Sequence, residues 1–387
     1  MWINNTNLIC DDKLAMLKRM GEVMQEENQQ KQDERWMKKA IQLAKKGVGT
    51  THPNPRVGAV VVNKGVIVGE GWHQRAGEPH AEINAIQKAG NSARGGTIYV
   101  TLEPCSSTGK TPPCTEAIQR AGIWRVVYAS SDPNPKMTGG GKLLAAHNVD
   151  VTGGVLRDEA DQLNQPFFHY IKTGRPYITA KGAISLDGKL ATHMHESQWI
   201  SGEQARKHAH GLRAESDAII IGSGTLMHDN PSLTVRDAKI KGDPPMRVVI
   251  GMKTPPFFPD CKLLDDAAPT RFYVRTTNED SARWRDAGVQ IGRAPDLISI
   301  LKHLAQDGCL QMLLEGGGKL HASFFEAQLT DELVLYQAPI LIGGHKAVSL
   351  WHGSGVDRVE KALRLENIQR RKMGEDQMIR GKIIYPE

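Results

Sequence analysis

Several features are scarce in this sequence, and each absence narrows its possible functions. Aromatic residues make up only 5% of the 387 residues, and no run of Lys and Arg carries interleaved aromatics. A base-stacking surface for single-stranded nucleic acid is therefore not expected. No apolar run approaches the roughly 18 residues of a membrane-spanning helix. The amino terminus, MWINNTNLIC, lacks the basic start and apolar core of a signal peptide.

Cysteine is also sparse and odd in number. The five cysteines are Cys10, Cys105, Cys114, Cys261 and Cys309. Without a signal peptide, this usage favours a reducing cytoplasm, with free thiols or a metal site in place of disulfides. We therefore expect a cytoplasmic protein that does not contact a membrane.

The overall composition is that of a globular protein of more than one domain. Hydrophobic residues make up 40% and charged residues 24% of the chain, which supports packed cores. A length of 387 residues is comfortable for two domains. The net charge of +6 is mild and suits a nucleic acid or a small phosphorylated metabolite equally well.

The order of predicted elements indicates two α/β domains after a polar extension. Strands alternate with helices in each half, which is typical of layered α/β folds. In the first half we predict helices over 33–47, 80–89, 114–121 and 157–171, with a hairpin turning near Asn63 and Gly65. The segment Lys172 to Pro176 has the Gly and Pro of a linker. We therefore expect an extension over 1–30, one domain over 31–175 and a second over 176–387.

The stretches EPHAEINAI and LEPCSSTGKTPPC carry the residues of a zinc site. Catalytic zinc takes three protein ligands and leaves one position for water. His80, Cys105 and Cys114 supply one imidazole and two thiolates. Glu82 is then placed to take a proton from the water and return it to a leaving amine. Mid-helix, two residues two positions apart diverge by about 200°, but in the first turn after Pro79 both can reach one site.

This pattern is close to the signature of zinc nucleobase deaminases, which is H-x-E followed by P-C-x-x-C. Here the second cysteine follows eight intervening residues, SSTGKTPP, in place of two. An alternative is that these residues are ordinary buried side chains. A purely structural zinc site is a second alternative, although it would normally close with four protein ligands.

The longer cysteine spacing and several other stretches resemble one family closely. They are HPNPRVGAVVV, GEGWHQRAGEPHAE, TLEPCSSTGKTPPC and DPNPKMTGGG in the first half, and AKGAISLDGKLAT, SQWISG, DAIIIGSGTLMHDNPSLTVR and LLEGGGKL in the second. In this order they resemble the bifunctional riboflavin-biosynthesis deaminase-reductases over about residues 33 to 385. The resemblance implies a cytidine-deaminase-like three-layer α/β/α domain followed by a dihydrofolate-reductase-like α/β domain.

The resemblance also implies an activity and a site for the first half. The family's first domain removes an amino group from a phosphoribosylated diaminopyrimidinone by hydrolysis. Its single zinc ligand set falls on His80, Cys105 and Cys114, and its proton shuttle on Glu82. The family more often has a histidine where this chain has Ser107. Positions that match the substrate pocket are Asn54, His73, Lys110 and Asn134, of which Lys110 matches a residue near the phosphate.

For the second half, the resemblance implies reduction of the ribosyl to a ribityl group with NADPH. The stretches EGGGKL and IIIGSGT are glycine turns after strands, and neither is G-x-G-x-x-G, so a Rossmann domain is disfavoured. Positions that match the substrate site are Lys181, Ser197, Leu233, Arg236 and Glu315. Positions that match the NADPH site are Ala183, Trp199, Thr225, Asp229, Gly317, Gly318, Lys319, Leu320, His321, Ala322 and Ser323.

Other functions stay open at this point. A nucleic-acid deaminase with an added binding domain would use the same H-x-E chemistry. A non-catalytic zinc module would need a fourth protein ligand, and the reductase half could be degenerate. The bifunctional enzyme is the reading we favour, with a small phosphorylated pyrimidine as partner, no nucleic acid and a homo-oligomeric assembly.

Overall fold

The chain forms two compact units. The computed structural model describes residues 6–107 and 112–386, and for residues 6–19 and 22 it describes only the backbone. The first unit ends at Asn164 and the second begins at Gln165. Among the described residues, no helix combines the length and the apolar character needed to cross a bilayer.

A mixed five-stranded sheet forms the centre of the first unit. Its strand order is β2 (Val66–Trp72), β1 (Gly58–Asn63), β3 (Thr97–Leu102), β4 (Arg125–Ser130) and β5 (Asp150–Gly153). The strand β1 is antiparallel to β2 and β3, whereas β3, β4 and β5 are parallel. The predicted hairpin is confirmed, with its turn at Lys64 and Gly65. Because β3 and β4 are parallel neighbours, the loops after their carboxyl ends meet at one edge of the sheet.

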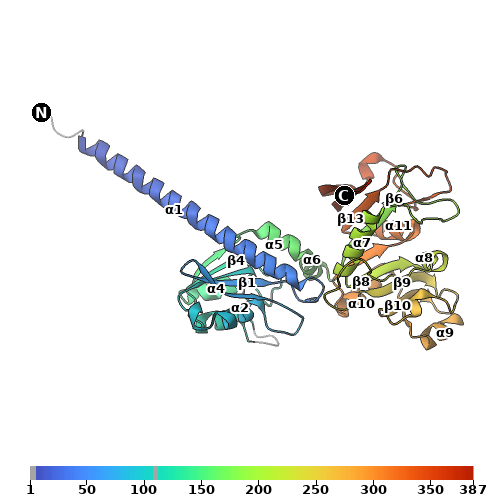
Figure 1. The fold of residues 1–387 in the computed structure, drawn as a ribbon, viewed down its shortest axis with the longest axis horizontal. Coiled ribbons are helices and arrows are strands. Elements are labelled where there is room, and N and C mark those ends of the chain that lie inside the picture. Colours follow the sequence, from blue (N-terminus) through green and yellow to red (C-terminus); the bar gives the residue numbers. More distant parts are fainter. Residues whose placement is uncertain (1–5, 108–111, 387) are drawn as a thin grey trace. The chain divides into compact units, whose positions relative to one another are not determined.

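Helices cover both faces of this sheet, which confirms the three-layer α/β/α arrangement (Figure 1). The helices α1 (Thr6–Ala44) and α5 (Arg157–Leu163) pack on the face that carries Val60 and Val127. The helices α2 (Ala81–Ala89), α3 (Cys114–Arg120) and α4 (Gly140–Ala146) belong to the opposite layer. Gly71 allows α2 to lie directly on β2, because a Cβ there would approach the carbonyl oxygen of Ala81 to 2.3 Å. This close packing fixes the position at which α2 begins.

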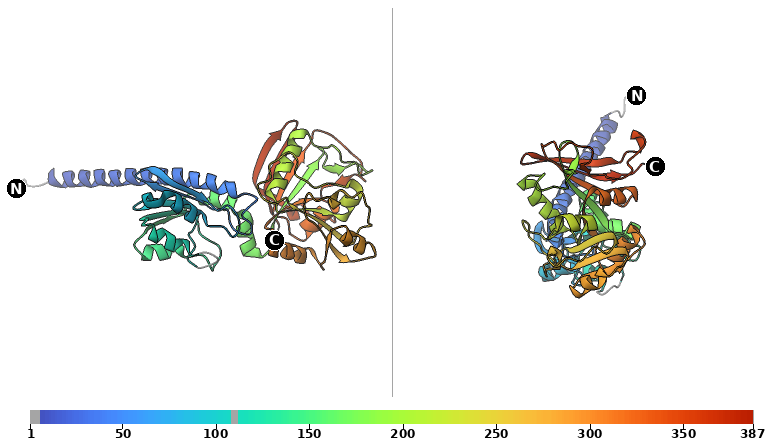
Figure 2. Two further views of the ribbon diagram at one scale, coloured as in Figure 1. Left: turned by 60° about the horizontal axis from the view of Figure 1, so that its bottom comes forward. Right: turned by 90° about the vertical axis from the view of Figure 1, so that its right-hand side faces the viewer.

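The helix α1 is longer than the predicted helix over 33–47. It is continuous from Thr6, so the described part of the predicted extension, 6–30, and the core helix form one element. Its carboxyl-terminal part is buried through Met37 and Ile41, whereas Met20 and Met24 are exposed. Figures 1 and 2 show the amino-terminal part of α1 continuing beyond the sheet of this unit.

The second unit is built on a nine-stranded sheet. The order is β11 (Gln290–Arg293), β10 (Thr270–Thr276), β9 (Met246–Lys253), β8 (Ala218–Gly222), β12 (Gln311–Glu315), β6 (Tyr177–Ile184), β13 (Glu332–Gln337), β16 (Asp376–Ile384) and β15 (Arg364–Met373). The strands from β11 to β13 are parallel, and β16 runs antiparallel to β13 and β15. A separate two-stranded ribbon joins β7 (Lys189–Ala191) and β14 (Val348–Ser349).

Helices pack on both faces of this second sheet. The helices α10 (Leu297–Gln306) and α11 (Gly318–Glu326) cover one face through Leu301 and Phe324. The other face is covered by α7 (Glu203–Glu215), α8 (Ser223–Asp229) and α9 (Asp280–Asp286), through residues such as Leu212, Leu226 and Trp284. This is the dihydrofolate-reductase-like α/β arrangement that the resemblance implies.

The helix predicted over 157–171 is wrong, because the chain breaks at Asn164. The structure has α5 up to Leu163 and a separate α6 (Gln165–Thr173). The Asn164 amide binds the backbone of Arg56 twice, accepting from its N–H (2.8 Å) and donating to its carbonyl oxygen (2.9 Å). Pro166 lies in the first turn of α6, where its missing N–H costs nothing.

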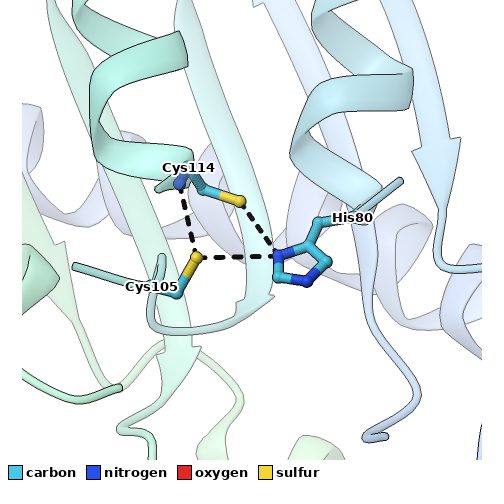
Figure 3. A group of neighbouring side chains, drawn as sticks. All are labelled: His80, Cys105 and Cys114. Carbon is cyan, nitrogen blue, oxygen red and sulfur yellow. Dashed lines mark hydrogen bonds between the residues drawn. The ribbon is translucent and has the colours of Figure 1, made fainter. Parts of the chain in front are cut away.

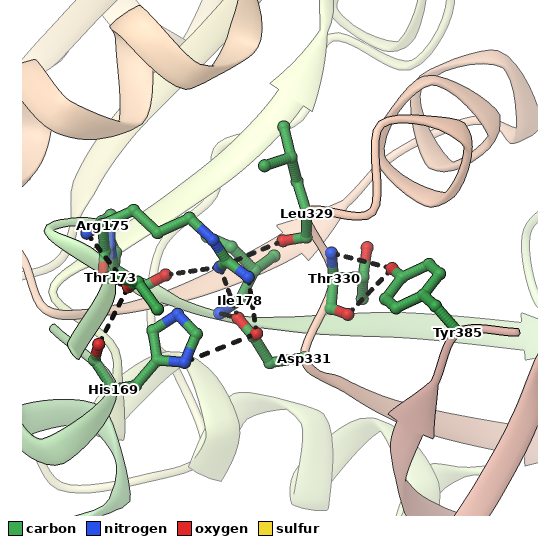
Figure 4. Close-up of polar contacts among 9 residues, drawn as sticks. His169, Thr173, Arg175, Ile178, Leu329, Thr330, Asp331 and Tyr385 are labelled. Carbon is green, nitrogen blue, oxygen red and sulfur yellow. Dashed lines mark hydrogen bonds and ion pairs between the residues drawn. The ribbon is translucent and has the colours of Figure 1, made fainter. Parts of the chain in front are cut away.

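The helix α6 is the first element of the second unit, and Asp331 anchors it there (Figure 4). The Asp331 carboxylate accepts two hydrogen bonds from the Arg175 guanidinium, both 2.8 Å long. It also accepts from the backbone N–H of Ile178 (2.8 Å), and His169 Nδ1 lies 3.6 Å away. The compact units therefore divide ahead of the Lys172–Pro176 segment that reads as a linker in the sequence.

Two candidate active sites

The three predicted metal ligands come together at the edge of the first sheet (Figure 3). His80 is the N-cap residue of α2, Cys114 is the first residue of α3, and Cys105 follows β3. His80 Nδ1 lies 3.2 Å from Cys114 Sγ and 3.6 Å from Cys105 Sγ. Bonds of about 2.1 Å to nitrogen and 2.3 Å to sulfur at a tetrahedral ion place these atoms roughly 3.6 Å apart. The donor set and its spacing therefore fit zinc.

The surroundings of Cys105 favour the thiolate that a metal needs. The Cys114 side chain and backbone N–H (3.3 Å) and the His80 ring all donate toward Cys105 Sγ. These hydrogen bonds hold the pKa of the Cys105 thiol well below its ordinary value. In the part of the chain that the structure describes, these three residues are the only group of three or more His, Cys, Asp or Glu side chains at metal-ligand spacing.

Glu82 lies one residue into α2 and is buried beside Cys114. Burial raises the pKa of the Glu82 carboxyl, although the nearby His80 ring acts in the opposite direction. A carboxyl group with a raised pKa can both accept and return a proton near neutral pH. The first-turn geometry that the sequence analysis required is therefore present.

Two of the predicted deaminase-substrate residues form a pair next to the metal ligands. The Asn54 amide nitrogen lies 3.1 Å from His73 Nε2, and His73 Nδ1 lies 3.2 Å from the carbonyl oxygen of Pro79. The His73 ring stands edge-on to the His80 ring at 5.8 Å. Burial lowers the pKa of His73, which keeps this ring neutral.

The predicted substrate residue Asn134 lies in the loop after β4. This loop contacts the segment after Cys105, because Ser107 Oγ donates to the carbonyl oxygen of Lys136 (2.5 Å). Ser107, where the family more often has histidine, is thus a bridge between the two loops. Lys110, the residue matched to a phosphate contact, lies outside the described residues.

Sequence reasoning missed Glu103 and Asp132, which organise the same edge. The buried Glu103 carboxylate accepts from the backbone of Gly139 (3.1 Å) and Gly141 (3.0 Å) and from the Thr138 hydroxyl (3.0 Å). Burial raises the pKa of Asp132 to about 6. Glu103 stands in the motif EPC, and Asp132 stands in DPNP. Each follows the carboxyl end of a parallel strand, and this position could have identified them from the sequence.

The second site is a cavity of about 1610 Å³ within the second unit. It runs along the carboxyl ends of β6, β12, β8, β9 and β10, where ligands bind in open parallel sheets. Pockets for a single small ligand usually measure about 300–1,000 Å³. This cavity is therefore large enough for a dinucleotide together with a second small molecule.

The cavity brings together all five predicted reductase-substrate residues. They are Lys181, Ser197, Leu233, Arg236 and Glu315. Burial alone would raise the pKa of Glu315, but the Arg213 guanidinium and the Lys181 ammonium lower it to about 2. The Glu315 carboxylate is thus ionised at the bottom of the cavity.

Arg213 is a cavity residue that sequence reasoning missed. Its guanidinium donates to both oxygens of Glu315 (2.8 Å and 2.7 Å) and to the carbonyl oxygen of Thr234 (2.9 Å). It therefore holds the loop that carries Leu233 and Arg236. Arg213 stands inside α7 without any motif around it, so the sequence alone offered no signal for it.

Most of the predicted NADPH residues also line the cavity. They are Ala183, Trp199, Thr225, Asp229, Gly317, Gly318, Lys319, Leu320 and Ser323. The structure does not bring His321 and Ala322 into this set, because both lie on the buried side of α11. The His321 ring is fully buried and packs against Phe325, with 6.0 Å between the ring centroids.

The glycine turn after β12 has the open space and the backbone donors that phosphate groups need. A Cβ at Gly317 would meet its nearest neighbour, Thr225 Oγ1, at 3.7 Å, and a Cβ at Gly224 would meet nothing within 4 Å. Both glycines line the cavity, so side chains there would occupy its space. The turn leads into α11, whose first backbone N–H groups suit an anion. These residues fit a dinucleotide pyrophosphate.

Comparisons with known proteins agree with both sites. The chain matches the cytidine and deoxycytidylate deaminase zinc-binding region over residues 30–130 and the RibD C-terminal domain over residues 176–379. It is 42% identical over 357 residues to the riboflavin biosynthesis protein RibD of Aquifex aeolicus, covering 90% of this chain and 97% of that one. It is 40% identical over 363 residues to the RibD protein of Escherichia coli, covering 89% and 98%.

Solved structures give the same result for the fold. The Acinetobacter baumannii RibD structure matches with a TM-score of 0.83 at 35% identity, covering 92% of this chain and 99% of that chain. A Thermotoga maritima diaminohydroxyphosphoribosylaminopyrimidine deaminase/5-amino-6-(5-phosphoribosylamino)uracil reductase matches with a TM-score of 0.80 at 32% identity, covering 92% and 100%. On this full-length similarity, and with both domain types in order, the chain belongs to the RibD family of bifunctional deaminase-reductases of riboflavin biosynthesis.

Proposed function

We propose that the first unit hydrolyses 2,5-diamino-6-(5-phosphoribosylamino)pyrimidin-4-one to the deaminated pyrimidine and ammonia. The observation that carries this proposal is the His80, Cys105 and Cys114 cluster with Glu82 buried beside it. One zinc ion per chain, held by these three ligands, would supply an activated water. Glu82 takes a proton from the attacking water and returns it to the leaving amine. The Asn54 and His73 pair, with Asn134, binds the pyrimidine, and Lys110 binds the phosphate.

The second unit then reduces the ribosyl side chain of the deaminated product to a ribityl side chain. Bound NADPH supplies the hydride. Lys181, beside the ionised Glu315, orients and polarises the sugar-derived group that accepts it. Arg236 is exposed at the cavity and presents a guanidinium fork to the substrate phosphate. Thr225, Asp229 and the glycine turn at Gly317 hold the cofactor.

The substitution Glu82→Gln tests the assignment of the two sites. Loss of the general acid–base group should lower deamination by at least about 10²–10⁴-fold. Zinc content and reduction of pre-deaminated substrate should stay at the wild-type level. The matched control is Glu116→Gln, the same charge change on an exposed residue of α3 that pairs with Arg120. If both reactions fail together in a folded, zinc-loaded Glu82→Gln protein, the two-site assignment is wrong.

A nucleic-acid deaminase is the competing function. It would need a basic surface with stacking aromatics beside the zinc site. The second unit instead offers a deep cavity whose lining fits a dinucleotide and a small molecule. We further propose a cytoplasmic homo-oligomer, which light scattering of the purified protein and fractionation of its host cell would test.

A further inference from the structure

One end of the reductase cavity has no assigned role. The residues proposed for substrate lie at β6 and β12, and the glycine turn follows β12 beside β8. The cavity continues past β9 and β10, where Met252, Arg275 and the segment 294–298 line it. Two strand spacings of about 4.8 Å separate β10 from β8. This end therefore lies on the far side of the glycine turn from Lys181.

The position of this end matches the adenosine half of a dinucleotide. A dinucleotide carries its two nucleosides on opposite sides of the pyrophosphate. With the pyrophosphate at Gly317 and the nicotinamide toward Ala183, the adenosine falls toward β9 and β10. This placement of the adenosine rests on the proposed NADPH site, and it gives a ligand to the end of the cavity that had none.

The walls at this end suit an aromatic base. Met252 and Ile298 expose 63% and 46% of their surface, although both are large and apolar. Leu297 is half-buried next to Ile298, and Pro295 is exposed. Apolar side chains that line a cavity and stay open to solvent mark a binding surface for a flat apolar group. The purine ring of adenosine is such a group.

Arg275 gives this end its charge. It follows the buried Val274 near the end of β10, and its exposed side chain forms no hydrogen bond and no ion pair within 4 Å to the residues that the structure describes. Lys262 adds a second cation at the cavity. A guanidinium with free donors binds a phosphate monoester by a bidentate fork.

Asp296 is an acidic residue at the same end of the cavity, and its position bears on whether this end prefers a ribose hydroxyl or a phosphate. A carboxylate near the adenosine ribose can accept from its hydroxyls and thereby favour NADH. Here, however, the Asp296 side chain caps α10 by accepting from the backbone N–H of Ser299 (2.8 Å). Hydrogen bonds from Ser299 lower the pKa of Asp296, and the charges of the nearby Arg275 and Lys302 lower it further. The one carboxylate at this end is therefore already engaged and has two cations near it, and this balance favours a phosphate.

We propose that Arg275 binds the 2′-phosphate of NADPH and selects NADPH over NADH, with Met252, Leu297 and Ile298 enclosing the adenine. Charge-assisted hydrogen bonds of this kind change affinity by about 10–100-fold. The full-length protein should therefore bind 2′,5′-ADP more tightly than 5′-AMP by this factor.

Calorimetric titration of 2′,5′-ADP and 5′-AMP into the full chain tests the proposal without turnover. In Arg275→Gln the preference for 2′,5′-ADP should fall close to one, while 5′-AMP affinity stays within about twofold of wild type. Arg275→Lys should keep part of the preference, which separates charge from folding. The matched control is Arg293→Gln, an exposed arginine at the end of the neighbouring strand β11 that does not line the cavity.

Three results would overturn the inference. Two of them reject only the role of Arg275, and the third also rejects the proposed cofactor site. An unchanged preference in folded Arg275→Gln, with normal NADPH binding, rejects only the role of Arg275. Equal loss of both nucleotides in that variant also rejects it, because the residue would then act on the site as a whole. Failure of the wild-type protein to bind either nucleotide or NADPH rejects the inference together with the proposed cofactor site.

Discussion

Gly317 is a single residue at which the lack of a side chain can be tested directly. Its backbone angles, φ −73° and ψ 164°, are open to any residue. An added Cβ would have only ordinary contact with Thr225 at 3.7 Å and would project into the cavity. The protein should therefore tolerate a methyl group here, whereas a phosphate that approaches the turn should not.

We accordingly expect Gly317→Ala to fold normally and to weaken NADPH binding by about 10–100-fold, the range typical of overpacking at a tight contact. Fluorescence titration of NADPH measures this change. The control is Gly211→Ala in the interior of α7, where a Cβ meets nothing within 4 Å. That variant should bind NADPH normally and gain up to about 1 kcal/mol of stability. A normal NADPH dissociation constant for Gly317→Ala would show that the NADPH phosphates do not approach this turn.

Asp33 gives a prediction about pH. Its buried carboxylate accepts from both terminal nitrogens of Arg125 (2.9 Å and 2.8 Å) and from the Tyr99 hydroxyl (2.9 Å). Burial raises the pKa of Asp33, but the hydrogen bonds from Arg125 and Tyr99 outweigh it, so the pKa lies below the ordinary 3.8. A lowered folded-state pKa contributes stability that is complete above the unfolded-state pKa and is lost as the pH falls through the folded-state value.

Asp33→Asn should therefore lower the free energy of unfolding at pH 7 by about 3–5 kcal/mol, because it leaves Arg125 buried with a weaker partner. Between neutral pH and about pH 4 the loss should be constant, and below about pH 4 the variant and the wild type should converge. Urea unfolding across this pH range measures both effects. Parallel curves down to pH 2 would show that Asp33 does not titrate with folding.

Among single residues, the sequence predicted the functional side chains that belong to short motifs. His80, Glu82, Cys105 and Cys114 were identified because zinc chemistry restricts both residue type and spacing. Glu103 and Arg213 were missed, because their importance lies in what they touch. The partners of Arg213, Glu315 and the backbone of Thr234, are separated from it by 102 and 21 residues.

At the scale of elements, the attachment of α6 to β6 inside the second unit depends on Asp331. This carboxylate ties α6 to β6 through Arg175, Ile178 and His169 (Figure 4). We expect Asp331→Asn to destabilise the second unit by about 3–5 kcal/mol, the cost of breaking a largely buried ion pair from one side. Thermal unfolding measures the loss, and limited proteolysis should show earlier cleavage near α6.

The control for this substitution is Asp357→Asn, whose pair with Lys361 is exposed on both sides. Exposed pairs contribute little, so its unfolding should match wild type. Equal unfolding of Asp331→Asn and Asp357→Asn would mean that α6 is held by its apolar contacts alone.

Element prediction succeeded where the signal is local. The β1–β2 hairpin and the two strands that precede glycine turns, β8 and β12, follow from apolar runs and the glycines after them. The break between α5 and α6 was missed because the partner of Asn164 is Arg56, 108 residues away. The helical period of α11 likewise decides that His321 is buried while Leu320 lines the cavity.

At the scale of the whole molecule, each unit carries the described residues of one candidate site. The zinc ligands and Glu82 lie before Asn164, and all residues that line the reductase cavity lie between Lys181 and His352. The two reactions should therefore be separable by mutation. In the proposed sequence of reactions, the second unit acts on the deaminated product of the first.

A product assay on the purified full-length protein tests this account most directly. The diaminopyrimidinone phosphate is supplied with and without NADPH, and the products are separated by mass. Without NADPH the deaminated ribosyl compound should accumulate, and with NADPH it should be converted to the deaminated ribityl compound with one NADPH oxidised per molecule. If no deaminated compound forms without NADPH, or if it forms and NADPH leaves it unchanged, one chain does not carry both sites.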